Sequence, residues 1–204
     1  LSENGIYSVS YKIPSILNVI QSIFSQAWIM SAVKAYDEEE AEFINKTYTI
    51  YNALFVIMCS VIIIFVKMIT RILVSSDFYE AWKYGPFLMI SVLFTSLSNF
   101  LGGIFAASKQ SSMLGKTTIM GAIINIVLNV ILIKNIGTMG AAIATMISYF
   151  FVWLFRLMYG KKIANLNIRI GRDLIGYFIL LIQAIIINTL KINTYLYMIE
   201  AVLC

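Results

Sequence analysis

Polar side chains recur along one face of the first long apolar segment, which covers residues 5–33. They follow one another at intervals of three or four residues, in the stripe Ser8, Tyr11, Ser15, Asn18, Ser22 and Ser25. At about 100° per residue these positions lie on one side of a helix, and aliphatic side chains cover the other side. Hydroxyl and amide groups so arranged can hydrogen-bond a hydroxyl-rich ligand or face water. The stripe predicts a transmembrane helix that lipid does not surround on all sides.

Two surroundings can accept this stripe. A neighbouring helix can pack against it through small polar residues, or the stripe can line a water-filled cavity inside a bundle. Serine alone favours packing. Bulkier polar side chains on the same segment favour the cavity, namely Tyr7, Tyr11, Asn18, Gln21 and Gln26. We therefore expect the stripe to line a cavity, and helix packing is the alternative.

Lys12 is a basic residue well inside this segment. A charge at the centre of a membrane helix costs about 2.5–3.5 kcal/mol on insertion scales. One interpretation is that its ammonium reaches the outer headgroups, and the other is that it faces the cavity and meets an anionic substrate. Pro14 removes a backbone donor two residues later and predicts a kink in the helix.

Amides and small residues mark the later segments. Asn125 and Asn129 lie one helical turn apart in the fourth segment, and each amide needs a hydrogen-bond partner in hydrocarbon. Bonds to a neighbouring helix are one interpretation, and substrate contact is the other. Stripes of small or hydroxyl side chains in the third and fifth segments predict close helix packing. They are Ser91, Thr95, Ser98, Gly102 and Ala106, with Asn99 adjacent, and then Gly140, Ala144 and Ser148.

The elements that carry these residues are predicted to be membrane-spanning helices. Of the 204 residues, 60% are hydrophobic and 12% are charged, whereas a soluble domain is about 45–50% apolar and about 25% charged. Six segments are long enough to cross a bilayer at about 20 residues each, and none alternates as a strand does. They cover residues 5–33, 47–66, 85–107, 117–133, 137–155 and 174–190, and a seventh begins near Tyr195. The sequence predicts an all-α, polytopic membrane helix bundle and excludes a soluble globular domain.

Several chemistries are excluded by composition. The sequence has no histidine and two cysteines, Cys59 and Cys204, both in apolar runs. Histidine-based catalysis is therefore impossible in this sequence, and neither a structural zinc site nor a disulfide framework has enough ligands. We expect no metal, no cofactor and no enzymatic activity. The net charge of +5 is expected to meet anionic lipid headgroups rather than nucleic acid.

Lysine and arginine counts in alternate loops predict the orientation, because positive charge is retained in the cytoplasm. One side has nine and the other five, and five of the nine lie between Arg156 and Arg172. The first segment is thus expected to run from outside to inside. The chain begins at Leu1 and ends in an apolar run, so we expect a fragment cut at both ends.

Several short motifs occur in a suggestive order. They are Asn4-Gly5-Ile6-Tyr7 leading into Tyr11-Lys12-Ile13, Phe24-Ser25-Gln26-Ala27-Trp28, Asn125 and Asn129 before Gly137, and Gly140-Ala141-Ala142-Ile143-Ala144-Thr145 with Ser148. Together they resemble the carboxy-terminal lobe of polysaccharide-repeat flippases, the O-antigen and capsule type, in the multidrug/oligosaccharidyl-lipid/polysaccharide exporter superfamily. The resemblance covers residues 2–157 well and the remainder only by hydropathy.

The resemblance implies a two-lobe exporter whose central cavity opens alternately to each side of the bacterial cytoplasmic membrane. Residues 1–157 would form helices of the second lobe and residues 158–204 additional, truncated helices, while the missing amino-terminal lobe of the same protein would complete the cavity. The implied substrate is a lipid-linked oligosaccharide repeat unit on polyprenyl pyrophosphate, moved outward for the synthesis of lipopolysaccharide or capsule.

The implied contacts are sugar binding by the polar side chains and pairing of Lys12 with the pyrophosphate. The expected substrate-binding residues are Tyr7, Tyr11, Lys12, Ser15, Asn18, Gln21, Ser22, Gln26, Asn125 and Asn129.

Other functions remain open. A drug or metabolite antiporter of the same superfamily commonly needs an intramembrane carboxylate, and no acid lies deep in the six segments, although Glu200 is a possible exception. A flippase of peptidoglycan precursors is disfavoured because the spans lack a dense cluster of cations. A membrane polysaccharide polymerase or ligase is disfavoured because the longest outward loop, residues 67–84, has no histidine. A purely structural membrane subunit is a further alternative.

Overall fold

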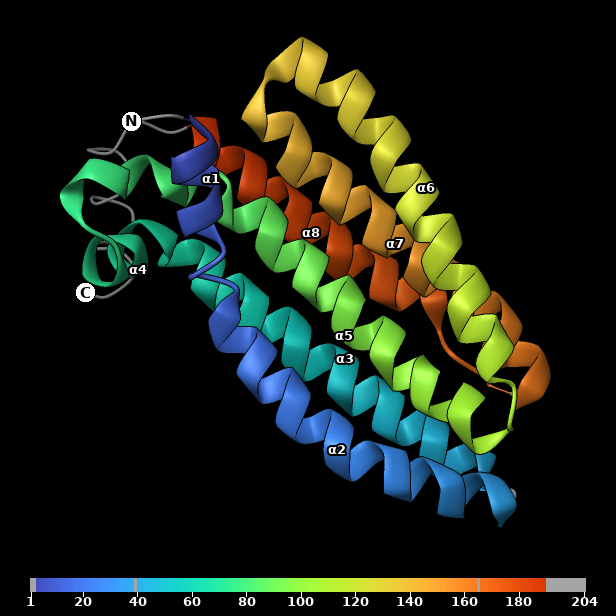
Figure 1. Ribbon diagram of the computed structural model, residues 1–204. Helices are drawn as coiled ribbons and strands as arrows, with labels where there is room; N and C mark the ends of the chain where they lie inside the picture. The colour runs from blue at the N-terminus through green and yellow to red at the C-terminus, as the bar shows by residue number, and fades with distance from the viewer. Residues whose placement is uncertain (1–2, 39, 165, 190–204) are drawn as a thin grey trace, which may run out of the picture.

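The computed structural model describes residues 3–38, 40–164 and 166–189 (Figure 1). Within these ranges the chain forms eight α-helices and one 3-10 helix, and it has no strand. Six helical segments are long and apolar enough to cross a membrane, namely Glu3–Asp37, Ala41–Ile64, Gly85–Ala107, Ser111–Ile136, Thr138–Ile163 and Ile170–Thr189. The predicted all-α membrane bundle is confirmed. The seventh apolar run near Tyr195 lies outside the described residues.

The first span consists of two helices, α1 (Glu3–Ser10) and α2 (Ser15–Asp37). Residues 11–14 form turns between them. There the Lys12 amide donates to the Val9 carbonyl over 3.0 Å, and Pro14 has no amide hydrogen to continue the ladder. The predicted kink at Pro14 is confirmed as a break, and the expectation of one continuous helix is corrected.

Helix α5 (Gly85–Ala107) lies at the centre of the bundle, and nearly all of it is buried. It packs against α2, α3 (Ala41–Ile64), α7 (Thr138–Ile163) and α8 (Ile170–Thr189) (Figure 1). Its approach to α2 requires glycine at position 103, because a Cβ there would lie 2.7 Å from Trp28 Nε1. The same Nε1 donates to the Phe100 carbonyl over 2.8 Å. Gly103 thus allows the close packing of α2 on α5.

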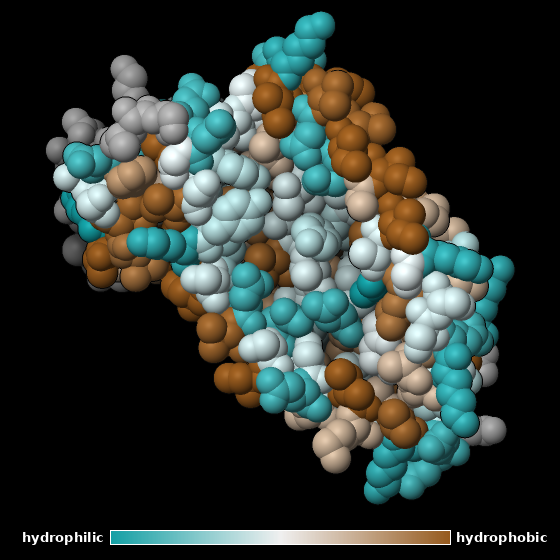
Figure 2. Space-filling model, viewed as in Figure 1, coloured by the Kyte–Doolittle hydropathy of each residue, from teal (hydrophilic) through white to brown (hydrophobic). Residues whose placement is uncertain are grey.

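Helix α6 (Ser111–Ile136) lies at the edge of the bundle and packs mainly on α7. The two helices join at Gly137, whose φ of +61° favours glycine. Gly140 lets the α7 backbone approach the Leu132 backbone of α6, where a Cβ would collide. Most of the remaining α6 surface is apolar and exposed, and Figure 2 shows it as a brown flank. In a bilayer this flank faces lipid.

Buried polar pairs join α3 to its other neighbours. Tyr177 of α8 donates from its hydroxyl to Asn52 Oδ1 over 2.9 Å. Trp153 of α7 donates from Nε1 to the Tyr48 hydroxyl over 3.0 Å. These bonds tie α7 and α8 to the bundle. The division between residues 1–157 and 158–204 stays a prediction, and residue 157 lies inside α7.

The predicted outward loop after α3 contains two short helices, α4 (Val66–Leu73) and the 3-10 helix η1 (Ser76–Lys83). Lys67 Nζ lies 4.3 Å from the ring centroid of Trp82, and the Arg71 guanidinium lies 5.5 Å from that of Tyr79. These cation–π contacts hold the two helices together. Helix α1 packs on η1.

Candidate functional site

A polar cavity of about 520 Å³ lies between α5, α6 and α7, and Tyr11 from the turn before α2 lines one side. Hydroxyl and amide side chains from the three helices line it, among them Thr95, Asn99, Thr118, Asn125, Thr145 and Tyr149. None of the described residues in its lining is acidic. Figure 2 shows pale and teal side chains gathered over α1 and α5, beside the apolar flank of α6. The cavity gives a ligand many hydrogen-bonding groups within an apolar bundle.

Arg156 supplies the positive charge of this cavity. It lies in α7 and is 8% exposed. Its guanidinium donates from Nη1 to the Ser98 carbonyl over 2.8 Å, from Nε to Thr117 Oγ1 over 3.2 Å and from Nη2 to Thr118 Oγ1 over 3.1 Å. The carboxylates of the described residues form ion pairs elsewhere or none, and none lies within 4.0 Å of Arg156. The cavity therefore has a buried cation without a counter-charge.

The sequence of α7 explains why Arg156 faces the cavity. It follows Thr145 by eleven residues and Tyr149 by seven, which are near multiples of the helical repeat, so all three lie on one face. On the opposite wall, Gly102 of α5 has no side chain, and a Cβ there would lie 3.4 Å from Arg156 Nη1. The large planar side chain thus fits between three helices.

Two of the predicted substrate-binding residues, Tyr7 and Tyr11, contact each other near the end of α1. Tyr11 lines the cavity, and its hydroxyl lies 2.9 Å from the hydroxyl of Tyr7, with either able to donate. The Tyr7 ring also packs edge-to-face on Tyr84, with centroids 5.6 Å apart. Tyr7 therefore positions Tyr11 and links it to the end of η1.

The remaining stripe on α2 does not line this cavity. Gln21 is half-buried and donates from Nε2 to Ser25 Oγ over 3.0 Å, and Ser22 donates from Oγ to the Val19 carbonyl over 2.8 Å. The other predicted substrate-binding residues of this segment are exposed, namely Lys12 in the turn and Ser15, Asn18 and Gln26 on α2. No described helix packs a dry seam over them, so the stripe presents an open polar face.

The two asparagines of α6 have different roles. Asn125 lines the cavity, whereas Asn129 does not. Asn129 Nδ2 donates to both the carbonyl and the Oδ1 of Asn125, each over 2.9 Å. The interpretation that Asn129 bonds a neighbouring helix is therefore wrong, because its amide bonds its own helix.

Arg156 was expected in a loop, because the fifth apolar segment of the sequence ends at residue 155. In the structure α7 continues to Ile163, so Arg156 lies about 10 Å inside the helix at 1.5 Å per residue. Its spacing from Thr145 was the signal that could have placed it on the cavity face. Three residues that were assigned to packing in the third segment also line the cavity, namely Thr95, Ser98 and Asn99.

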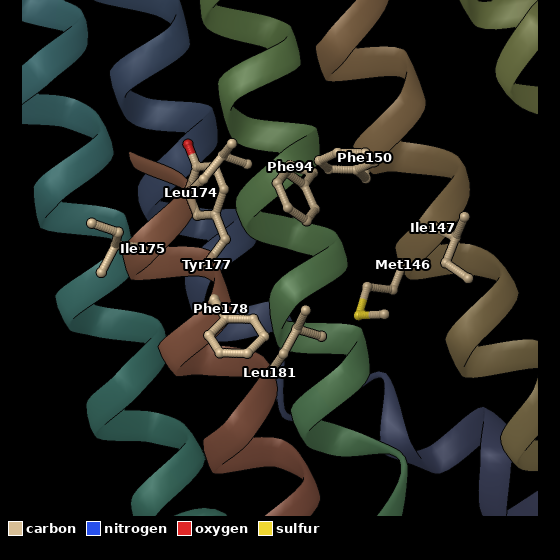
Figure 3. Close-up of a pocket in the computed structure, with 9 residues that line it drawn as sticks. All are labelled: Phe94, Met146, Ile147, Phe150, Leu174, Ile175, Tyr177, Phe178 and Leu181. Atoms are coloured by element: carbon tan, nitrogen blue, oxygen red, sulfur yellow. The ribbon is translucent and has the colours of Figure 1, made fainter. Parts of the chain in front are cut away.

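A second pocket, of about 560 Å³, lies between α5, α7 and α8 and is almost wholly apolar. Figure 3 shows Phe94, Met146 and Phe150 on one side and Phe178 and Leu181 on the other. Such a lining fits a hydrocarbon chain.

Asp173 is a buried acid in the first turn of α8, and 4% of it is exposed. Arg172 Nη2 donates to its Oδ1 over 2.9 Å, whereas Oδ2 is buried without a hydrogen-bond partner. The predicted sixth segment began one residue later and so excluded it. Among the described residues, no group of three cysteine, aspartate or glutamate side chains could hold a metal ion.

Comparisons with known proteins place these features in context. The family described as Lipid II flippase MurJ matches residues 3–173. An uncharacterized membrane protein of Methanocaldococcus jannaschii is 24% identical over 156 residues, which are 76% of this chain and 30% of that protein. The chain thus spans about a third of the length of this relative. No solved structure matches the chain. The family match supports a flippase and does not confirm the O-antigen and capsule branch.

Proposed function

The chain belongs to the Lipid II flippase MurJ family, and on this premise we propose that it is part of a transporter that moves a lipid-linked precursor between the leaflets of a membrane. A flippase is a transporter and not an enzyme, so the cavity binds and releases a headgroup without breaking covalent bonds. The multi-pass fold suits this role. The proposed location is the bacterial cytoplasmic membrane.

The polar cavity is the observation that carries the proposal. It combines neutral hydrogen-bonding side chains with Arg156, while another face of α7 lines an apolar pocket. Sugar hydroxyls that leave water need replacement hydrogen bonds, because each unpaired group carries a penalty. A lipid-linked sugar has both a hydroxyl-rich headgroup and a hydrocarbon tail, and the two pockets match these two chemistries.

We propose that the exposed polar stripe on α2 forms a second wall of the same cavity. Tyr7, Tyr11 and the α2 residues Asn18, Gln21 and Gln26 are proposed to contact sugar. Lys12 is exposed beside Tyr11 and is proposed to pair with a pyrophosphate. The amino-terminal lobe expected from the family resemblance would cover the stripe and enclose the substrate between the lobes. Alternating access would then expose it to each side in turn.

The proposed substrate class is a sugar joined to a polyprenyl chain through pyrophosphate. The order of the sequence motifs favours an oligosaccharide repeat unit, whereas the family match favours lipid II. The sequence argument against lipid II was the lack of cations within the spans. Arg156 weakens that argument, because it is a second cation within the spans besides Lys12, and it is buried.

A drug or metabolite antiporter is the second candidate, and Asp173 is the observation that favours it. A buried carboxylate with one unpartnered oxygen suits an ion-coupled cycle. Asp173→Asn should then abolish ion-driven uptake of a cationic dye by proteoliposomes. If dye uptake is absent in the unmodified protein as well, the antiporter is contradicted.

The decisive experiment measures flipping by the complete protein in proteoliposomes, with fluorescent lipid II and a fluorescent repeat-unit lipid assayed side by side. We expect transport of one of them. Lys12→Gln should slow transport about tenfold, since a hydrogen bond to a charged group contributes about 1.5–3 kcal/mol. Lys34→Gln is the matched control, because Lys34 is an exposed lysine in the last turn of α2, the helix that follows the Lys12 turn.

Two outcomes contradict parts of the proposal. Absence of transport for both lipids contradicts the flippase function. Equal rates for the unmodified protein, Lys12→Gln and Lys12→Ala remove Lys12 from the site and leave the flippase function in place.

A further inference from the structure

We propose that Arg156, with Asn99 and Asn125 on the walls of the same cavity, forms a binding subsite for a phosphate or pyrophosphate group within the α5–α6–α7 cavity, separate from Lys12. The inference rests on the proposed function only for the identity of the molecule that carries the phosphate. The subsite itself follows from charge, burial and geometry.

The charge argument begins with the surroundings of the guanidinium. Arg156 is 8% exposed in a membrane helix, where an unpaired charge is costly. The described groups that it contacts are a carbonyl and two hydroxyls, none of them anionic. Buried charges are normally paired. An anion that enters the cavity would supply the missing partner.

The geometry leaves donors for this anion. A guanidinium has five N–H groups in a planar fork, and three of those on Arg156 bond Ser98, Thr117 and Thr118. One N–H on Nη1 and one on Nη2 therefore remain. Each of them can donate a charge-assisted hydrogen bond to a phosphate oxygen. The three bonds to α5 and α6 fix the plane of the fork before a ligand arrives.

Neutral donors complete the site. Asn99 of α5 and Asn125 of α6 line the same cavity as Arg156, and each amide can donate two hydrogen bonds. The described lining has no carboxylate to repel an anion. A volume of about 520 Å³ also leaves room for part of a headgroup beyond the phosphate, because small-molecule sites are about 300–1,000 Å³.

Lys12 is exposed and does not line this cavity. It follows Tyr11, which pairs with Tyr7, and Tyr7 interacts with Thr145 of α7. Thr145 precedes Arg156 by eleven residues, which is about 16 Å along the helix. Lys12 and Arg156 are thus proposed to bind the charged group at two separate positions.

A purely structural role for Arg156 is the rival explanation. Its three hydrogen bonds join α5, α6 and α7 and need no ligand. A structural tie depends on Ser98, Thr117 and Thr118, whereas an anion site also depends on Asn99. Asn99 makes no hydrogen bond to Arg156 and is exposed to the cavity, so its replacement leaves the tie intact. This difference provides the test.

The experiment uses the complete protein in phosphatidylcholine nanodiscs and measures dissociation constants for three probes. These are inorganic pyrophosphate, polyprenyl pyrophosphate without sugar, and phosphatidylglycerol. For the probe that binds most tightly, Arg156→Gln should weaken binding at least about tenfold, and Asn99→Leu about threefold, as expected for a charged and a neutral hydrogen bond. Arg156→Lys should be intermediate, because it keeps the charge and loses the fork.

Lys162→Gln is the matched control, since it removes an exposed charge from the same helix. It should change binding less than about twofold, the range of a screened surface charge. Tighter binding of polyprenyl pyrophosphate assigns the phosphate to a lipid substrate, tighter binding of inorganic pyrophosphate to a soluble ion, and tighter binding of phosphatidylglycerol to a bilayer headgroup. Any of these three results supports the subsite when Arg156→Gln weakens the binding of that probe.

Three results overturn the subsite. They are equal affinity of Arg156→Gln and the unmodified protein for every probe, an equal loss in Lys162→Gln, or, where Arg156→Gln does not fold, unchanged affinity in Asn99→Leu. Binding that depends on Arg156 without flipping contradicts only the proposed function, and flipping without such binding contradicts only the subsite.

Discussion

The polar faces of α7 and α2 have similar helical spacing, but only α7 has side chains on its polar side that bond other helices. On α7, Arg156 and Trp153 donate hydrogen bonds to residues of other helices. On α2, Ser22 donates to the Val19 carbonyl of its own helix, and Ser15 donates to the Lys12 carbonyl of the turn before it. The α7 face is therefore tied to neighbouring helices within the described residues, whereas the α2 face is bonded locally and open toward its surroundings.

This difference shows that a polar stripe predicts that a helix avoids lipid, but not what the stripe contacts. Helix α2 also has a buried side, where Trp28 and Leu17 pack into the core. Its polar side is free for another surface because the buried side alone holds the helix in place. The α7 face has no such freedom, since its cation is needed between three helices.

Labelling of single cysteines should show the largest difference, between the exposed face of α2 and the buried contact of α6 with Arg156 of α7. In a background with Cys59→Ala and Cys204→Ala, Ser22→Cys should react with a water-soluble maleimide at least about 100-fold faster than Thr117→Cys, because reaction requires an exposed thiolate. Thr117 is fully buried and Ser22 is exposed. Protection of Ser22→Cys from both sides of the membrane in every state would instead indicate a dry helix interface and would remove the central cavity.

Packing behind the α7 face is tested by two glycines. Gly140→Ala should lower the free energy of unfolding by about 1–3 kcal/mol, because its Cβ collides with the Leu132 backbone. Gly115→Ala on α6 should raise it by about 0.5–1 kcal/mol, because nothing lies within 4 Å and alanine favours the helix. Unfolding in mixed detergent measures both. A loss in Gly115→Ala equal to that in Gly140→Ala would contradict the tight α6–α7 contact.

The two sides of α2 differ by the smallest expected amount. Trp28→Phe removes the hydrogen bond to the Phe100 carbonyl and should cost about 1–2 kcal/mol. Gln26→Ala changes an exposed side chain and should stay within about 0.5 kcal/mol. Both are read from the same unfolding experiment. If Gln26→Ala costs as much as Trp28→Phe, the polar side of α2 is packed against protein and not open.

The spans and the break at Pro14 were predictable because hydropathy and proline chemistry are local properties of the sequence. The polar stripe of the first span was predicted to line a cavity, and among the described residues Tyr11 alone of this stripe lines the polar cavity between α5, α6 and α7, because the partner of a stripe depends on packing between distant segments. Arg156 was assigned to a loop because charge was taken to end the span, whereas burial between three helices extends it. Asn129 was expected either to bond another helix or to contact substrate, and in the structure its amide donates to its own helix, which has an acceptor one turn away.

Helices α1 and α2, on the two sides of the break, pack against different elements. Helix α1 contacts η1 and α7, and α2 contacts α5 and α3. Residues 11–14 belong to neither helix, so the turn and not a helical ladder sets the direction of the Tyr11 side chain. The phenol therefore reaches the cavity from the point where the chain changes its packing partners, whereas the guanidinium reaches it from within α7.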